Sequence, residues 1–390
     1  MAIAFGLGFL FVLALSQTAW GRSQILAYTL RTLGGRLNGE LAVQRLEGNV
    51  ITGARLYDIL VTDAAGAPLA AADSAYIQYR IASFLGGDVV IHRLVAYDAR
   101  VELFRMPGDT VWNYQEVLTD PTPDATDGTG ADAGATLLES LTLIDSEVSV
   151  RRPLEPDPRL SQEAQDARME EMLADTSYVL EEVPGGYLRT TIIDIEQVGA
   201  EELFIGPTER GGTYAEIVNA NADVYFRRDP PLEVREGRGQ LHLREGVLEF
   251  RVPEVVLPNS RGEGLGSIDF TSGRPMYNLF IDSPSFSLSD LRWLYPWLPD
   301  DPEAGGGSAE VRIEDRAEGR LVLARDLLLE MPGTEVTGDF GLISGPESVR
   351  FIEVELEANP LRVESVEALF PDDLPVQGLV IGGATIRGVS

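Results

Sequence analysis

The chain has 390 residues, of which 44% are hydrophobic and 24% are charged, so it is long enough for a large core or several domains. Its 62 acidic residues face 31 basic ones, all of them Arg, and the net charge is -31. A surface this acidic repels nucleic acid phosphates and gains nothing from anionic lipid headgroups. Cysteine is absent, which excludes disulfides and thiolate metal sites.

The N-terminal segment is strongly apolar. Residues 2–20 carry no charged side chain, and about 20 apolar residues are needed to cross a bilayer. Residues 1–22 are therefore expected to form a transmembrane anchor or, alternatively, a signal peptide; a buried core helix is a third interpretation. Either of the first two places the body outside the cytoplasm. Ser23 to Arg36 predicts a short helix that ends at Gly34-Gly35.

Residues 23–118 predict a first β module. Apolar and polar residues alternate from Gly48 to Tyr114, with turns at Gly and Pro, which is typical of strands with one dry face. Such strands, joined by short turns, predict an antiparallel sheet with a continuous apolar face. A short helix is expected from Asn113 to Leu118.

A flexible linker is predicted for residues 119–136, which are rich in Pro, Asp, Thr and Gly. Its Asp124, Asp127 and Asp132 lack the ligand spacing of a calcium loop, so a solvated linker is favoured. Strands resume in residues 137–282, apart from an insertion at residues 153–174. Within the insertion, Ser161 to Leu173 predicts a charged helix that lies over the sheet or crosses one end of it.

Residues 283–390 contain an internal repeat. Ser289 to Pro296 matches Glu364 to Pro371, and each copy follows a strand and a Pro, which indicates repeated strands that end in a short helix. Between the copies, strands are expected around Val311, Leu321 and other apolar positions. The chain ends inside a strand-like pattern, so a longer natural protein is expected.

The strands together predict an apolar face that could bind the acyl chains of lipids. The face is expected to be open, because few long amphipathic helices are available to cover it. An open apolar face on a curled sheet forms a trough. The alternative is that the same residues pack on a second layer as a closed core. The candidate lipid-contacting residues are Ile77, Tyr79, Ile81, Val101, Leu103, Leu241, Leu243, Leu321 and Leu323.

Two alternative functions are a glycan hydrolase and a structural β-repeat protein. A carboxylate-based glycan hydrolase would use acidic pairs such as Asp300-Asp301 and Asp372-Asp373, but both pairs lie beside Pro in apparent turns. His92 and His242 are far apart and indicate neither a triad nor a zinc site, and no nucleophile, phosphate-loop or zinc-protease motif occurs. A structural or adhesive β-repeat protein should instead be polar on both faces. Neither a cofactor nor a metal is expected.

Several motifs resemble a known family. The apolar N-terminus is followed by Gly48-Asn49-Val50-Ile51-Thr52-Gly53 and Leu56-Tyr57-Asp58-Ile59-Leu60-Val61, then Gly66-Ala67-Pro68-Leu69, the run from Leu94 to Phe104, and Trp112-Asn113. This order resembles the N-terminal region of AsmA-like proteins, in particular the TamB branch.

The resemblance implies a protein anchored in the inner membrane through residues 2–20, with its body in the periplasm. It also implies phospholipid acyl chains as ligands, a role in phospholipid transport or outer-membrane biogenesis, and an outer-membrane protein partner bound through a C-terminal region absent here. The expected fold is mainly β: an elongated, curled antiparallel β-sheet groove built from repeats, with an N-terminal transmembrane helix and a few short helices.

Overall fold

The computed structural model describes residues 38–49, 53–79, 89–109, 111–118, 136–154, 161–205, 212–271, 275–293, 296, 298, 304–316, 319–344, 349–362 and 378–386. These residues are mainly β-strand, as the sequence pattern predicts. The chain divides into two compact units: unit 1 is Met1–Leu154 with Leu180–Arg210, and unit 2 is Glu155–Val179 with Gly211–Ser390. β7 (Val179–Val183) falls on the boundary between them.

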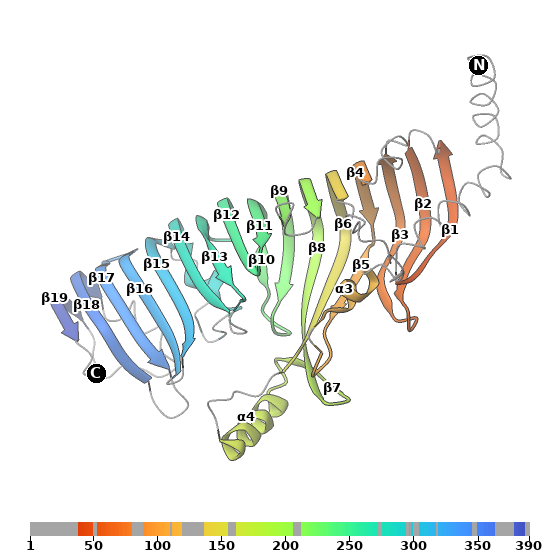
Figure 1. Ribbon diagram of the computed structural model, residues 1–390. Helices are drawn as coiled ribbons and strands as arrows, with labels where there is room; N and C mark the ends of the chain where they lie inside the picture. The colour runs from red at the N-terminus through yellow and green to blue at the C-terminus, as the bar shows by residue number, and fades with distance from the viewer. Residues whose placement is uncertain are drawn as a thin grey trace, which may run out of the picture. The chain divides into compact units, whose positions relative to one another are not determined.

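Unit 1 is a sheet in which most strands follow the chain order (Figure 1). Its strands are β1 (Gly39–Asn49), β2 (Gly53–Asp63), β3 (Pro68–Tyr79), β4 (Val89–Tyr97), β5 (Arg100–Phe104), β6 (Thr136–Pro153) and β8 (Gly186–Ile205). β1, β2, β3 and β4 pair antiparallel in succession, and β6 pairs antiparallel with β8. β4 and β5 together occupy one position in the sheet, because both pair with β3 on one side and with β6 on the other.

The purely antiparallel sheet expected from the sequence is wrong at β6, which runs parallel to β4 and β5. A parallel pairing needs a long crossover, whereas an antiparallel one can be made by a short turn. The chain between Phe104 and Thr136 is long enough for this crossover, and it includes α3 (Asn113–Leu118). The sheet of unit 1 is therefore mixed.

The side-chain alternation of unit 1 is interrupted along one row across the strands. Ala72 and Ala75 are three residues apart, as are Ala96 and Ala99, yet all four contribute to one apolar cluster, so each strand reverses its alternation there. Carboxylate residues in the left-handed region occur at this row: Asp58, Asp98 and Asp145 have φ of 52°, 50° and 49°. Asp is among the residues that tolerate this conformation best. The interruption keeps apolar side chains on the same face on both sides of the row.

α3 begins at the predicted residue and is held against β5 by a side chain. Asn113 is 5% exposed; its Oδ1 accepts a hydrogen bond from the Phe104 N–H at 2.9 Å, and its Nδ2 donates to the Glu102 carbonyl at 2.7 Å. The amide thus pairs with two backbone groups of β5. Val117, on the same helix, is fully buried. The predicted helix from Asn113 to Leu118 is confirmed.

Unit 2 is a sheet of consecutive hairpins, and every pairing among its described strands is antiparallel. Its strands are β9 (Thr213–Tyr225), β10 (Leu232–Val234), β11 (Glu236–Arg244), β12 (Val247–Val256), β13 (Arg261–Asp269), β14 (Met276–Ser287), β15 (Ala304–Arg316), β16 (Gly319–Met331), β17 (Thr334–Ser344), β18 (Val349–Arg362) and β19 (Leu379–Ile386).

A tight turn shows how the sequence sets the pairing in unit 2. Glu245 and Gly246 join β11 to β12 with φ of 52° and 79°, and two positive φ values in a two-residue loop match the twist of a hairpin. β9 pairs with β10 and also with β11. On the other side of β11, the sheet runs to β19 in chain order.

Two further helices lie among the described residues of unit 2. α4 (Gln162–Ala174) confirms the predicted charged helix, and η3 (Leu288–Leu291) is a short 3-10 helix at the start of the first repeat copy. Four predicted segments lie outside the described residues. They are the second repeat copy, the helix from Ser23 to Arg36, the apolar residues 2–20, and nearly all of the 119–136 linker. No helix within the described part of the chain combines the length and hydropathy needed to cross a membrane.

Candidate functional site

The strand register of unit 2 sorts its side chains onto two faces. Directly paired residues of neighbouring strands point to the same side, and successive residues of a strand alternate. Two adjacent rows that cross β11 to β18 are apolar throughout. We call them the apolar face: Leu241, Leu243, Leu248, Phe250, Gly266, Ile268, Tyr277, Leu279, Val311, Ile313, Val322, Ala324, Phe340, Leu342 and Phe351.

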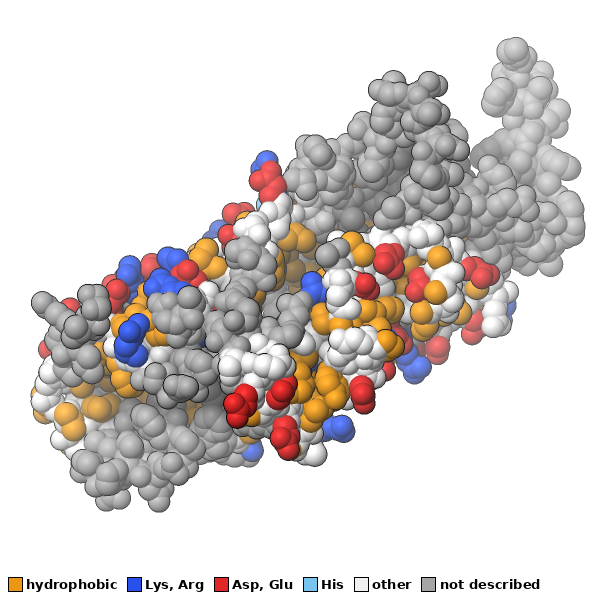
Figure 2. All heavy atoms as spheres, turned by 60° about the horizontal axis from the view of Figure 1, so that its bottom comes forward, with side chains coloured by type: hydrophobic (Ala, Val, Ile, Leu, Met, Phe, Trp, Pro, Cys, Tyr) orange, Lys and Arg blue, Asp and Glu red, His pale blue; other side chains and the backbone are white. Residues whose placement is uncertain are grey.

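Among the described residues, no second layer of structure seals the apolar face. None of its large side chains is buried, and Leu243 and Phe351 are 41% and 48% exposed. Phe340 and Phe351 contact each other edge to face, with ring centroids 5.9 Å apart, which confirms that these two rows share one side. Figure 2 shows one side of the molecule, where hydrophobic side chains lie open between acidic and basic ones. Contiguous apolar surface of this kind is uncommon on soluble proteins, which makes this face the candidate site.

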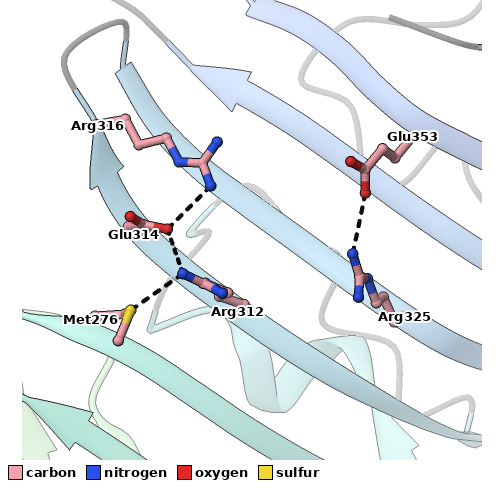
Figure 3. Close-up of polar contacts among 6 residues, drawn as sticks. All are labelled: Met276, Arg312, Glu314, Arg316, Arg325 and Glu353. Atoms are coloured by element: carbon pink, nitrogen blue, oxygen red, sulfur yellow. Dashed lines mark hydrogen bonds and ion pairs between the residues drawn. The ribbon is translucent and has the colours of Figure 1, made fainter.

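The opposite face of unit 2 carries the charged side chains, and we call it the charged face. Figure 3 shows its ion pairs: Glu314 accepts from Arg312 at 2.9 Å and from Arg316 at 3.3 Å, and Arg325 lies 3.4 Å from Glu353. Glu310 and Arg325 are directly paired in the register, on this same face. These charged side chains thus lie on the side away from the apolar residues. One sheet therefore offers two chemically distinct surfaces.

Glycines thin the apolar face at β13. Gly262, Gly264 and Gly266 alternate with polar or large residues and fall on the apolar side, so β13 contributes little side-chain volume there. A Cβ on Gly266 would lie 2.2 Å from the Asn278 carbonyl oxygen, whereas a Cβ on Gly264 would meet nothing closer than 3.5 Å. Gly266 is thus required by close backbone approach, and Gly264 has room for a side chain.

The described residues of unit 2 form a hollow on each face of the sheet. The first has a volume of about 340 Å³ and lies on the apolar side beside η3; its apolar lining includes Val255, Ile281, Phe286, Leu291, Leu327 and Leu329. The second has a volume of about 870 Å³ and is lined mostly by residues of the charged face, among them Arg251, Leu265, Phe280 and Arg312. Both volumes fall in the range of about 300–1,000 Å³ found for small-molecule sites.

Unit 1 brings most of its predicted site residues onto one face. Ile77 lies in an apolar row with Ala54, Leu94 and Leu141, and Tyr79 pairs with Ile91. Val101 and Leu103 are on β5 and pair with Val148 and Val150 of β6. Because the alternation reverses between Ala72 and Ala75, Ile77 and Val101 share a face although their strands would otherwise be out of phase. Ile81 lies outside the described residues.

Unit 2 separates its four predicted site residues. Leu241 and Leu243 pair with Phe250 and Leu248 on the apolar face. Leu321 and Leu323 point to the charged face, because they pair with Glu314 and Arg312 of β15. Leu321 is also fully buried, with 0% exposure, so a ligand on the surface cannot contact it. The expectation that all four residues line one surface is therefore not met.

The residues that replace them are Val322 and Ala324, the neighbours of Leu321 and Leu323. The run Leu321-Val322-Leu323-Ala324 is apolar at every position, so the sequence of β16 alone cannot assign a face. The neighbouring strand β15 carries a sequence pattern that does assign the face of β16. Val311 and Ile313 alternate with Arg312 and Glu314, and the antiparallel register that pairs Arg316 with Gly319 sets Ile313 opposite Val322.

No catalytic constellation accompanies these faces within the described residues. His92 Nδ1 lies 2.6 Å from Glu139 in unit 1, and His242 lies 3.8 Å from Glu249 in unit 2. No group of three or more His, Asp or Glu side chains that could hold a metal occurs in the described part of the chain. The Asp300-Asp301 and Asp372-Asp373 pairs fall outside it.

Perturbed carboxylates mark structural contacts instead of a reactive site. The Arg261 guanidinium hydrogen-bonds to Glu254 and lowers the pKa of that carboxyl. The Thr271 hydroxyl and backbone N–H donate to Asp269, at 2.6 and 2.8 Å, and lower its pKa. Ser177 lowers the pKa of Asp175 in the same way. Asp269 and Asp175 lie at a strand end and a turn, where such bonds fix the backbone, and Glu254 links β12 to β13.

Comparison with known proteins identifies no relative: no family model, no curated protein and no solved structure matches this chain.

Proposed function

We propose that this protein shields the acyl chains of phospholipids on the apolar face of its β-sheet and serves in phospholipid transport or outer-membrane biogenesis. The observation that carries the proposal is the run of apolar side chains across β11 to β18, which is uninterrupted by charge and open to solvent. A structural β-repeat protein without a ligand has no need of such a face, because its exposed surface would be polar on both sides.

The energetics favour hydrocarbon as the ligand. Transferring an acyl chain of about 16 carbons into water costs on the order of 12 kcal/mol, at about 0.8 kcal/mol per CH₂. Contact with the apolar face shields the acyl chain from water and avoids much of this cost. The same contact also buries the apolar side chains of the protein. Since hydrophobic contact is non-directional, lipids should be selected by their chains more than by their headgroups.

The cellular setting is part of the proposal and rests on the resemblance to AsmA-like proteins. Residues 2–20 would anchor the chain in the inner membrane, and the β-rich body would lie in the periplasm. The charged face suits this arrangement, because its ion pairs and carboxylates remain hydrated while the apolar face holds lipid. A C-terminal region beyond this chain would contact an outer-membrane protein.

A pair of photo-crosslinking variants tests the proposal. A photoreactive residue is placed at Val322 on the apolar face or at Leu323, its neighbour on the charged face, and the full chain is irradiated in membranes. Phospholipid adducts are expected at Val322 and not at Leu323. Extraction and mass spectrometry of the purified chain should also recover phospholipid. Recovery of lipid-free protein, with no adduct at either position, would refute the proposed function.

A further inference from the structure

We propose that the hollow beside η3 binds the terminal methyl end of one acyl chain and fixes where that chain stops on the apolar face. This inference rests on the proposed function and adds a direction to it. The chain end enters the hollow, and the headgroup lies away from η3. The ligand portion is saturated hydrocarbon, and the hollow takes no part of a headgroup.

The floor and sides of the hollow are hydrocarbon. Ile281 and Leu279 alternate to the same side of β14, and Leu327 and Leu329 lie on the corresponding side of β16. Ile281 is 45% exposed, so the surface is open to a ligand. The hollow thus continues the apolar face toward η3 without a break.

Several polar groups around the hollow are engaged within the protein. The Ser283 hydroxyl lies 2.9 Å from the Arg261 carbonyl, to which it donates, and the Ser287 hydroxyl lies 2.7 Å from that of Ser289. Ser260 Oγ accepts from the Ser287 N–H at 2.9 Å, and Arg261 is paired with Glu254. These bonds occupy the Ser283 and Ser287 hydroxyls, and Glu254 takes an N–H of Arg261, so the hollow favours hydrocarbon over a headgroup.

The wall that closes the hollow is fixed by hydrogen bonds. Leu291 of η3 lines the hollow, and Leu288, one turn earlier, is 7% exposed. The Asn259 backbone N–H donates to Asp290 Oδ2 at 2.9 Å, and its side-chain Nδ2 donates to Asp290 Oδ1 and Ser289 Oγ, each at 3.2 Å. Ser287 caps η3 by accepting from the Ser289 N–H. Because these hydrogen bonds fix η3, its Leu291 side chain is expected to block further advance of the acyl chain.

Two photoreactive phospholipids test the direction of binding. Both are phosphatidylethanolamines in vesicles; one carries a diazirine at the terminal carbon of an acyl chain, and the other carries it next to the chain carbonyl. The full chain is loaded and irradiated, and adducts are assigned by tandem mass spectrometry. The terminal probe is expected to label Phe286, Leu291 and Leu327. The carbonyl probe is expected to label other residues of the apolar face, such as Ile313.

A filling variant supplies the second measurement. Ala309→Phe places a ring into the hollow, and Thr337→Phe places the same ring on the charged face as a control. Ala309→Phe should lower terminal-probe labelling of Leu291 by about tenfold, the ratio that corresponds to about 1.4 kcal/mol. Thr337→Phe should leave it unchanged.

The outcomes separate this inference from the proposed function. Equal labelling patterns from both probes, or undiminished labelling of Leu291 in Ala309→Phe, would overturn the inference and leave lipid binding by the apolar face intact. Absence of adducts from either probe on any residue would instead remove the proposed function itself.

Discussion

A single charge placed on either face of β16 gives the sharpest test of how this protein uses its sheet. Val322 pairs with Ile313 and Leu342 on the apolar face, whereas Leu323 pairs with Arg312 on the charged face. Val322→Asp and Leu323→Asp therefore make the same chemical change one residue apart. Both side chains are half-buried, so each variant should lose a similar stability, about 1–2 kcal/mol.

The two variants should differ in lipid binding. A carboxylate in contact with hydrocarbon costs about 2.5–3.5 kcal/mol on membrane-insertion scales, so Val322→Asp should weaken phospholipid binding roughly 100-fold. In Leu323→Asp the new carboxylate faces Arg312 and water, so binding should change less than about threefold. The dissociation constants are measured by displacement of an environment-sensitive fluorescent phospholipid, with circular dichroism to verify that both variants fold.

Equal dissociation constants for the two variants would refute the assignment of lipid to the apolar face. A loss confined to Leu323→Asp would move the binding site to the larger hollow on the charged face.

Further variants test the folds of the two units. Gly338→Ala should destabilise unit 2 by about 1–3 kcal/mol in chemical denaturation, because its φ is +126° and a Cβ would lie 1.9 Å from a neighbouring carbonyl oxygen. Gly264→Ala should instead stabilise by about 0.5–1 kcal/mol, since its Cβ would have ordinary contacts; the opposite order would contradict the backbone geometry. Asn113→Ala should cost about 2–4 kcal/mol because two backbone groups of β5 lose their partner, whereas the exposed Glu116→Ala should change little in the same denaturation. The lowered pKa of Asp269 contributes stability that is present above its unfolded value of about 3.9 and is lost as the pH falls through the lower folded value. The stability difference between wild type and Asp269→Asn should therefore shrink on acidification from about pH 6 to about pH 3, and a constant difference would exclude this linkage.

Local pattern was enough to predict most elements of this protein. In β18 the alternation is plain in the sequence: Leu356 and Ala358 are half-buried, whereas Glu355 and Glu357 are exposed. The helices at Asn113–Leu118 and Gln162–Ala174 were likewise expected to within a residue. These elements depend on side-chain period and on residues that begin or end a helix, and both are visible in a single sequence.

Which strands pair with each other was harder to predict from the sequence. The parallel contact of β6 with β4 and β5 depends on where the chain returns after Phe104, and a crossover leaves no periodic signal. The reversal of alternation in unit 1 is also hidden, because Asp98 and Asp145 look like ordinary exposed residues until their positive φ is known.

The sequence by itself determined that this protein is built from two-faced strands, because the period-two alternation of apolar and polar residues follows directly from extended backbone geometry. Only the tertiary structure decided which apolar residues share a surface. In a strand such as Leu321-Val322-Leu323-Ala324 both faces are apolar, and the register of the neighbouring strand alone sends Val322 to the apolar face and Leu323 to the charged one. A shift of one residue in that register would exchange the two, since pairing across strands, and not composition, sets the side to which each residue points.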